Sequence, residues 1–138
     1  YTSISLALDG ELPPDVTLIA YGGMAPFAAQ AALNAFMQDE VRVEIIVPSR
    51  IKPCPLTDVL PSVCKSGRVV IVEESVQYSG WGAELASQIY EAAFSELVKP
   101  IERVGAKNAP IPSAKPLEDE VLPTVEDVEA AIYRQANA

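Results

Sequence analysis

The sequence predicts an α/β fold in three layers, with helices on both faces of a mainly parallel, five-stranded sheet. Two observations support this prediction. Segments with strand-type patterns alternate along the chain with segments whose apolar residues recur at helical spacing. In addition, four consecutive β-branched residues at 69–72 lie between Gly67–Arg68 and the acidic pair Glu73–Glu74, which is typical of a central strand buried on both faces.

The N-terminal part of the chain predicts two strands and a helix. Residues 2–8 alternate loosely between polar and apolar, as in a half-covered edge strand, and their short proline link to the next strand allows an antiparallel course. Residues 16–21 form the second predicted strand, which Gly22–Gly23 end. A helix follows from Pro26, and we expect one apolar face of it to be buried. The residues of that predicted face are Ala29, Ala32, Leu33, Phe36 and Met37.

The middle of the chain predicts a third strand, a loop and the central strand. Residues 41–47 form the third strand, and the proline-punctuated segment 49–58 is predicted as a loop. A short helix is expected around residues 60–64. After the central strand the chain turns at Gly80–Gly82 into a second long helix, in which Glu84 lies near the N-terminal amides, where negative charge is favoured. Its predicted buried residues are Ala86, Ile89, Ala93 and Leu97.

The C-terminal part predicts a fifth strand and a last helix. Residues 101–104 form the strand, and the segment 105–123 is predicted to be extended on the surface, because it carries Pro110, Pro112 and Pro116 and shows no apolar periodicity. Thr124 is the predicted N-cap of the last helix, since its hydroxyl can reach the amide of Asp127. The predicted buried residues of this helix are Val125, Val128, Ala131 and Ile132.

The chain is 138 residues long and predicts a single domain, residues 1–138. Ten basic and nineteen acidic residues give a formal net charge of -9, so nucleic acid and anionic membrane are poor partners and a basic partner fits better. No apolar run is long enough to span a bilayer. Cys54 and Cys64 lack a metal or redox spacing, and we interpret both as free thiols in a reducing compartment. Because the first residue is Tyr1 rather than Met, we expect a piece of a longer polypeptide.

The sequence offers little for autonomous catalysis. It contains no histidine, which removes the commonest general base and a favourite zinc ligand. The turns Gly22–Gly23 and Gly80–Gly82 each lie between a strand and a helix, as phosphate-binding turns do, but both lack the remaining residues of a nucleotide fingerprint. We interpret them as tight turns, with a free-standing nucleotide- or flavin-binding module as the alternative. No catalytic, cofactor-binding or metal-ligating residue is predicted.

Six residues are candidates for contact with a partner. Glu73 and Glu74 are adjacent in a strand and point to opposite faces, so they cannot act on one substrate atom, and capping or interface roles suit them better. Trp81 follows the carboxyl end of the sheet, where partners often dock, although covering the sheet edge is an equally good interpretation. The extended stretch Pro110–Pro112 suits a partner's groove or the domain's own surface. The candidates are Glu73, Glu74, Trp81, Glu84, Pro110 and Pro112.

A set of ordered motifs covers nearly the whole chain. The motifs are Asp15–Gly22, Val69–Glu74, Gly80–Glu84, Pro100–Val104, Pro110–Pro112, Leu117–Asp119 and Leu122–Val125. In this order they resemble the C-terminal domain of the beta subunit of thiamine-dependent 2-oxoacid dehydrogenases of the pyruvate dehydrogenase type. The wider relatives are transketolase and deoxyxylulose-phosphate synthase, and the last motifs favour the beta-subunit branch. One departure is Ser113, where many relatives have an aromatic residue or a histidine.

The resemblance implies a five-stranded mixed sheet with one antiparallel strand, and a role in assembly rather than in chemistry. In this family other domains hold thiamine diphosphate and Mg²⁺, and the whole enzyme decarboxylates a 2-oxoacid and acylates lipoyl groups. This domain is therefore expected to bind no cofactor and to be inactive alone. Its expected partners are other domains and subunits of the dehydrogenase, the dihydrolipoyl acyltransferase core, and further copies in a homo-oligomer. The expected location is the cytoplasm, or the mitochondrial matrix in a eukaryote.

Overall fold

Five strands form one mixed sheet in the computed structural model, which describes residues 2–8 and 10–137. The strands are β1 (Ile4–Ala7), β2 (Val16–Ala20), β3 (Val43–Val47), β4 (Val69–Val76) and β5 (Glu102–Ala106). Their order is β1-β3-β2-β4-β5. Four strands run parallel, whereas β1 pairs antiparallel with β3, with Leu6 opposite Ile45. The predicted fold class, including the antiparallel first strand, is confirmed.

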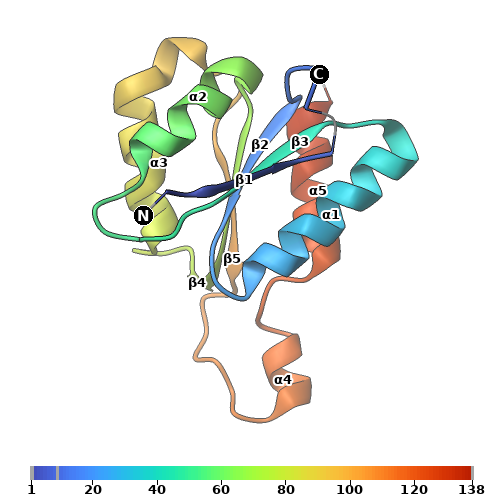
Figure 1. Cartoon of the computed structure of the whole chain (residues 1–138). Coiled ribbons are helices and arrows are strands. Elements are labelled where there is room, and N and C mark those ends of the chain that lie inside the picture. The colour runs from blue at the N-terminus through green and yellow to red at the C-terminus, as the bar shows by residue number, and fades with distance from the viewer. Residues whose placement is uncertain (1, 9, 138) are drawn as a thin grey trace.

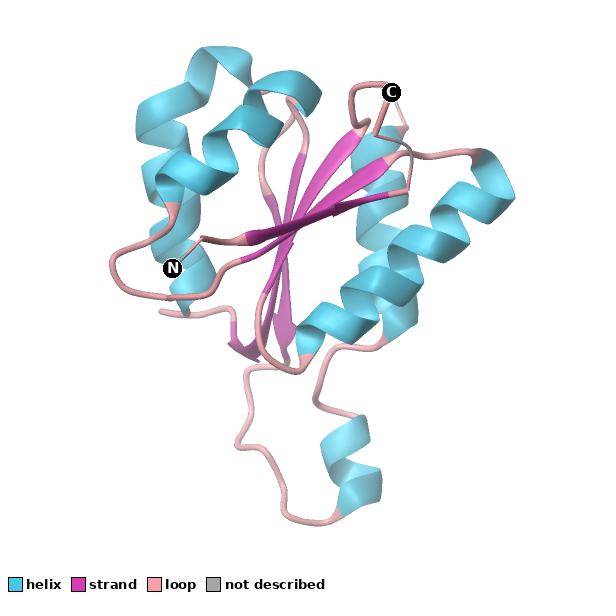
Figure 2. Cartoon of the chain, viewed as in Figure 1, coloured by secondary structure: helices cyan, strands magenta, loops and turns pink. Residues whose placement is uncertain are grey.

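Helices cover both faces of this sheet, so the molecule has three layers (Figure 1). The helices are α1 (Met24–Asp39), α2 (Leu56–Ser66), α3 (Trp81–Ala93), α4 (Lys115–Asp119) and α5 (Val125–Ala136), with a 3-10 turn η1 (Phe94–Glu96) after α3. Figure 2 shows α1 and α5 on one side of the sheet and α2 and α3 on the other. A helix connects each successive pair of parallel strands, because parallel neighbours require a crossover connection.

The central strands β2 and β4 are buried because helices cover both of their faces. Every residue of β2 is buried, as are the first five residues of β4. The Thr17 hydroxyl in β2 lies 2.7 Å from the hydroxyl of Ser62 and 2.8 Å from that of Ser66, both on α2. These hydrogen bonds satisfy hydroxyl groups that would otherwise be costly to bury. They also join α2 to the sheet.

The buried face of α1 differs from the predicted one. Ala32 is buried as predicted and Phe36 is half-buried, but Ala29 and Leu33 are exposed and Met37 is 74% exposed. The helix packs against the sheet and against α5, and small alanines permit this close approach on two sides. Periodicity could not choose the face, because apolar residues surround most of α1. The buried residues are Met24, Ala28, Ala31, Ala32 and Ala35.

The edge strand β1 is less covered than predicted. We expected a half-covered strand, but all four of its residues are exposed, with Ile4 at 58% and Leu6 at 48%. Helix α1 packs over β2, β3 and β4 instead. The alternation of polar and apolar residues indicated the correct element, but it did not show how far the neighbouring helix reaches.

Several predicted segments differ from the structure at their ends; for example, α1 begins at Met24 rather than Pro26 and β3 begins at Val43 rather than Val41. The helix expected around residues 60–64 begins earlier, at Leu56, so the preceding loop is shorter than predicted. Helix α3 ends at Ala93, and Leu97 packs on the core beyond the helix. The segment 105–123, predicted as extended, contains the end of β5 and the short helix α4. Proline is compatible with the first turn of a helix, where its missing N–H costs no hydrogen bond, and α4 has its proline there.

Helix α5 begins at the predicted cap. The Asp127 N–H donates to the Thr124 hydroxyl at 3.2 Å, and the Asp127 carboxylate accepts the Thr124 N–H at 2.9 Å. This capping box satisfies two N–H groups that have no partner inside the helix. Most of the predicted face is also buried, with Val128, Ala131 and Ile132 at 0% exposure, whereas Val125 is only partly buried.

Candidate functional site

Glu73 lies at the carboxyl edge of the sheet, where β4 leaves the core. Its side chain is 0% exposed. One carboxylate oxygen accepts the backbone N–H of Gly82 at 3.1 Å and the Ser75 hydroxyl at 2.8 Å. The other oxygen lies 3.4 Å from the guanidinium of Arg103 on β5. The bond to Gly82 places a negative charge at the N-terminus of α3, where the helix dipole favours it.

Glu74 points to the opposite face of the sheet and is exposed. It lies against Gly23, the N-cap of α1: a Cβ atom added to this glycine would lie 2.1 Å from an oxygen of Glu74. A side chain at residue 23 would therefore displace the carboxylate. The two neighbouring carboxylates lie near the N-termini of helices on opposite faces of the sheet, so they do not converge on one point.

These two carboxylates limit what the glycine turns can bind. A helix N-terminus normally attracts phosphate, because its N–H groups and dipole favour negative charge. Here Glu73 fills the N-terminus of α3 and Glu74 borders that of α1, so a phosphate group would meet a carboxylate at either turn. The two glycine turns therefore do not suit the diphosphate of thiamine diphosphate or of a nucleotide. Among the described residues, no three His, Cys, Asp or Glu side chains are grouped to hold a metal ion.

Trp81 begins α3 and packs against the protein itself. Its ring meets that of Tyr21 edge to face, with ring centroids 5.0 Å apart, and its indole N–H donates to the Ile51 carbonyl at 3.0 Å. These contacts hold the loop before α2 against α3. Burial in this region raises the pKa of the Tyr21 phenol and of the Cys54 thiol. Trp81 therefore packs within the domain, and its role as an interface anchor stays a prediction.

Glu84 is exposed in the first turn of α3, where its carboxylate accepts a hydrogen bond from the Gln88 amide at 2.7 Å. The sequence analysis did not identify two further residues of this edge, Tyr21 and Arg103, as candidates. Their only signal is a position at the end of a predicted strand, because a single tyrosine or arginine shows its partners only when neighbouring strands are placed.

Pro110 and Pro112 lie in residues 107–123, which we call the arm. Figure 1 shows the arm extending beyond the carboxyl edge of the sheet, away from the other helices. A backbone hydrogen bond from Lys107 to the carbonyl of Val121, at 2.9 Å, closes its base. Pro110 is exposed and Pro112 half-buried. None of the residues of α4 is buried, so this helix adds surface rather than core.

Both cysteines, Cys54 and Cys64, are free thiols, as predicted. Across residues 2–8 and 10–137, no helix combines the length and the apolar character needed to cross a membrane.

Comparison with known proteins identifies relatives of the chain. The family model for the transketolase C-terminal domain matches residues 8–128. The mitochondrial pyruvate dehydrogenase E1 component subunit beta-2 of Oryza sativa subsp. japonica is 35% identical over 120 residues, which cover 87% of this chain and 32% of that protein. The pyruvate dehydrogenase E1 component subunit beta of Rickettsia felis is 38% identical over 119 residues, covering 86% and 36%. The chain thus spans about a third of the length of these relatives.

Two solved structures share the fold of this chain. A split-gene transketolase, described as an inactive beta4 tetramer, superposes with a TM-score of 0.78 at 24% identity, covering 96% of this chain and 42% of that one. A 2-oxoglutarate:ferredoxin oxidoreductase from Magnetococcus marinus gives a TM-score of 0.62 at 13% identity, covering 97% and 20%. These likenesses show the fold, and the match over residues 8–128 shows that the chain belongs to the transketolase C-terminal domain family.

Proposed function

We propose that the chain is a non-catalytic assembly and docking domain of the beta subunit of a thiamine-diphosphate-dependent 2-oxoacid dehydrogenase. The parent enzyme decarboxylates a 2-oxoacid and acylates lipoyl groups, and its other domains bind thiamine diphosphate and Mg²⁺. Relatives named as pyruvate dehydrogenase beta subunits support this parent. The observation that supports the non-catalytic role is that Glu73 accepts the Gly82 N–H at the N-terminus of α3 and Glu74 borders the N-terminus of α1.

The surface of the domain supports a docking role. The formal charge of -9 favours a basic segment, and we assign that segment to the dihydrolipoyl acyltransferase core. The arm, with Pro110 and Pro112, is proposed to contact other domains or subunits of the parent, since it projects from the sheet and buries no residue of α4. Residues 1–138 are proposed to be one domain of a longer chain. The mitochondrial and bacterial relatives support a location in the mitochondrial matrix or the bacterial cytoplasm.

Isothermal titration calorimetry of the chain with thiamine diphosphate and MgCl₂ tests the non-catalytic role. We expect no heat of binding, because both glycine turns already face carboxylates. Tight binding of the cofactor by this chain alone would reject the proposal. A thermal-shift screen with adenine nucleotides and flavins tests the alternative module, since a ligand at a hundred times its Kd stabilises a protein by about 2.7 kcal/mol.

Self-association is proposed from the beta4 tetramer that the structural neighbour forms. If Trp81 is an anchor of that contact, Trp81→Ala weakens self-association in sedimentation velocity. Tyr78→Ala is the matched control, because Tyr78 is a nearby aromatic residue that is 80% exposed. An unchanged sedimentation coefficient for Trp81→Ala would leave Trp81 with its packing role alone.

Docking to the acyltransferase core is tested by a pull-down at rising salt. Charge-driven contacts between exposed groups weaken as salt screens them. We expect retention of the acyltransferase to fall steadily with ionic strength. Retention that is independent of salt would contradict charge as the driving force.

A further inference from the structure

A cavity of about 550 Å³ opens beside the end of β5, at the base of the arm. Among the described residues, no acidic side chain lines it, although acidic residues outnumber basic residues nineteen to ten in the chain. Its lining residues are Gln77, Tyr78, Arg103, Gly105, Ala106, Lys107 and Asn108. The charged residues of this lining are thus basic, whereas the chain as a whole is acidic.

The local fold brings these residues together. Residues 103, 105 and 107 point to one face while the chain stays extended, because side chains alternate along a strand. The register of β4 with β5 shifts between Val72 and Val76, and the carbonyl of Ser75 passes so close to Gly105 that an added Cβ would lie 2.8 Å from it. The glycine thus lets the end of β4 approach β5, which places Gln77 and Tyr78 beside Arg103 and Lys107.

The lining has more hydrogen-bond donors than acceptors available. The Nη2 group of Arg103 donates to Glu73 and to the Gln77 carbonyl, but its Nε is buried without a hydrogen-bond partner in the described part of the chain. In the described part of the chain, the side chains of Tyr78, Lys107 and Asn108 form no hydrogen bond. The buried Nε is out of reach of a ligand in the cavity, so the donors that such a ligand can contact include the side chains of Lys107, Asn108 and Tyr78. The complementary ligand for this lining is an anion with several oxygen acceptors.

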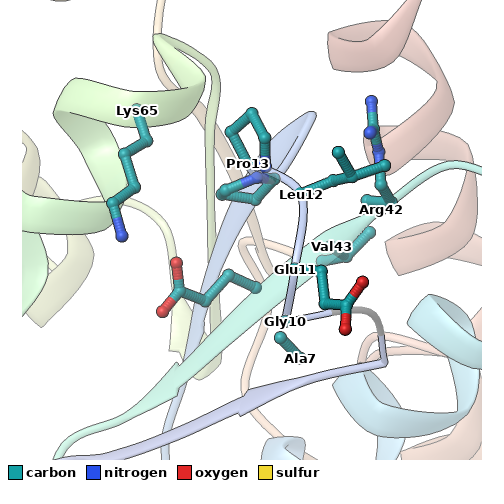
Figure 3. Close-up of a pocket in the computed structure, with 10 residues that line it drawn as sticks. Ala7, Gly10, Glu11, Leu12, Pro13, Arg42, Val43 and Lys65 are labelled. Carbon is teal, nitrogen blue, oxygen red and sulfur yellow. The ribbon is translucent and has the colours of Figure 1, made fainter.

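A second cavity shows the contrast (Figure 3). It measures about 350 Å³ and lies at the amino end of β3, near the last turn of α2. Lys65 and Arg42 line it together with Glu11 and Glu44, and Arg42 also pairs with Asp15 at 2.7 Å. Basic and acidic side chains are mixed there, so this second cavity has no comparable preference for an anion.

We propose that the cavity at the end of β5 binds a small oxyanion, a free phosphate or carboxylate ion. Lys107 supplies a positive charge that no carboxylate of the described lining neutralises, and Arg103 supplies further N–H groups while it stays paired with Glu73 on its other side. Asn108 and Tyr78 are additional donors. The bound anion joins the end of β4, the end of β5 and the base of the arm. Through Arg103 this site adjoins Glu73 at the N-terminus of α3, but the anion itself is not placed at a helix N-terminus.

An amide NMR titration of the chain at constant ionic strength tests this site, with inorganic phosphate in one arm and acetate in the other. We expect saturable shifts at residues 77–78 and 103–108 with a Kd in the millimolar range. Lys107→Gln should weaken binding about tenfold, which corresponds to about 1.4 kcal/mol. Lys65→Gln is the matched control, because it removes a lysine from the second cavity, and it should bind as the wild type does.

The two arms of the titration identify the source of the ligand, since tighter binding of phosphate indicates a phosphate ion and tighter binding of acetate a carboxylate. The absence of saturable shifts with both anions would overturn the proposal. Unchanged affinity in Lys107→Gln would overturn it as well. Neither result bears on the assembly role, which the thiamine diphosphate titration decides.

Discussion

Replacing Glu73 by alanine removes the carboxylate that joins β4, α3 and β5. In the wild type this group accepts hydrogen bonds from Gly82 and Ser75 and pairs with Arg103. Glu73→Ala leaves the guanidinium of Arg103 without its counter-charge and the N–H of Gly82 without its acceptor. Both consequences destabilise the folded state.

The expected loss in the free energy of unfolding follows from these contacts. Breaking a buried ion pair by removing one partner costs about 3–5 kcal/mol. The side chain of Arg103 is 22% exposed, so water solvates part of it and the lower end, about 3 kcal/mol, applies. The buried N–H of Gly82, once unsatisfied, adds on the order of 1 kcal/mol. We therefore expect Glu73→Ala to lower the free energy of unfolding by about 4 kcal/mol. Glu73→Gln keeps an acceptor and should lose about half of that.

Urea unfolding followed by circular dichroism measures this difference as a shift in the unfolding midpoint at unchanged slope. Glu74→Ala is the matched control, because it removes the neighbouring carboxylate from the same strand. Glu74 is exposed, and its favourable position at the start of α1 accounts for only about 0.3–1 kcal/mol. Equal losses in Glu73→Ala and Glu74→Ala would refute the assigned network, as would a Glu73→Gln variant as stable as the wild type.

Three further changes test other parts of the structure. Gly82→Ala places a Cβ 2.7 Å from an oxygen of Glu73 and should cost about 1–3 kcal/mol in urea unfolding; a neutral effect would contradict the close packing there. Thr124→Ala removes the cap of α5 and should cost about 1 kcal/mol, while Thr124→Ser, which keeps a hydroxyl, should lose much less. The hydrogen bond from Arg42 lowers the pKa of Asp15 below its ordinary value of 3.8, so this pair stabilises the fold above that pH and the contribution disappears as pH falls through the lowered pKa. The stability difference between wild type and Asp15→Asn should therefore be constant near neutral pH and shrink in acid, and a difference that persists in strong acid would disprove the assignment.

The sequence predicted the elements whose signals are local. The β-branched run at 69–72 identified the central strand, because only a strand covered on both faces is so uniformly apolar. Thr124 and Asp127 identified the start of α5, because a capping box needs only four consecutive residues. The order of short motifs along the chain also indicated the family, and the family match over residues 8–128 confirms it.

The tertiary structure decided which faces are covered and which charges meet. Periodicity could not select the buried face of α1, because that choice depends on where α5 packs, nearly a hundred residues later in the chain. The same holds for Glu73: its partners Gly82 and Arg103 come from a different helix and a different strand. Hydrogen bonds and ion pairs act over a few ångströms in space, whereas the sequence records only distance along the chain, so the carboxylate network and the donor-rich cavity emerge only once β4 and β5 lie side by side.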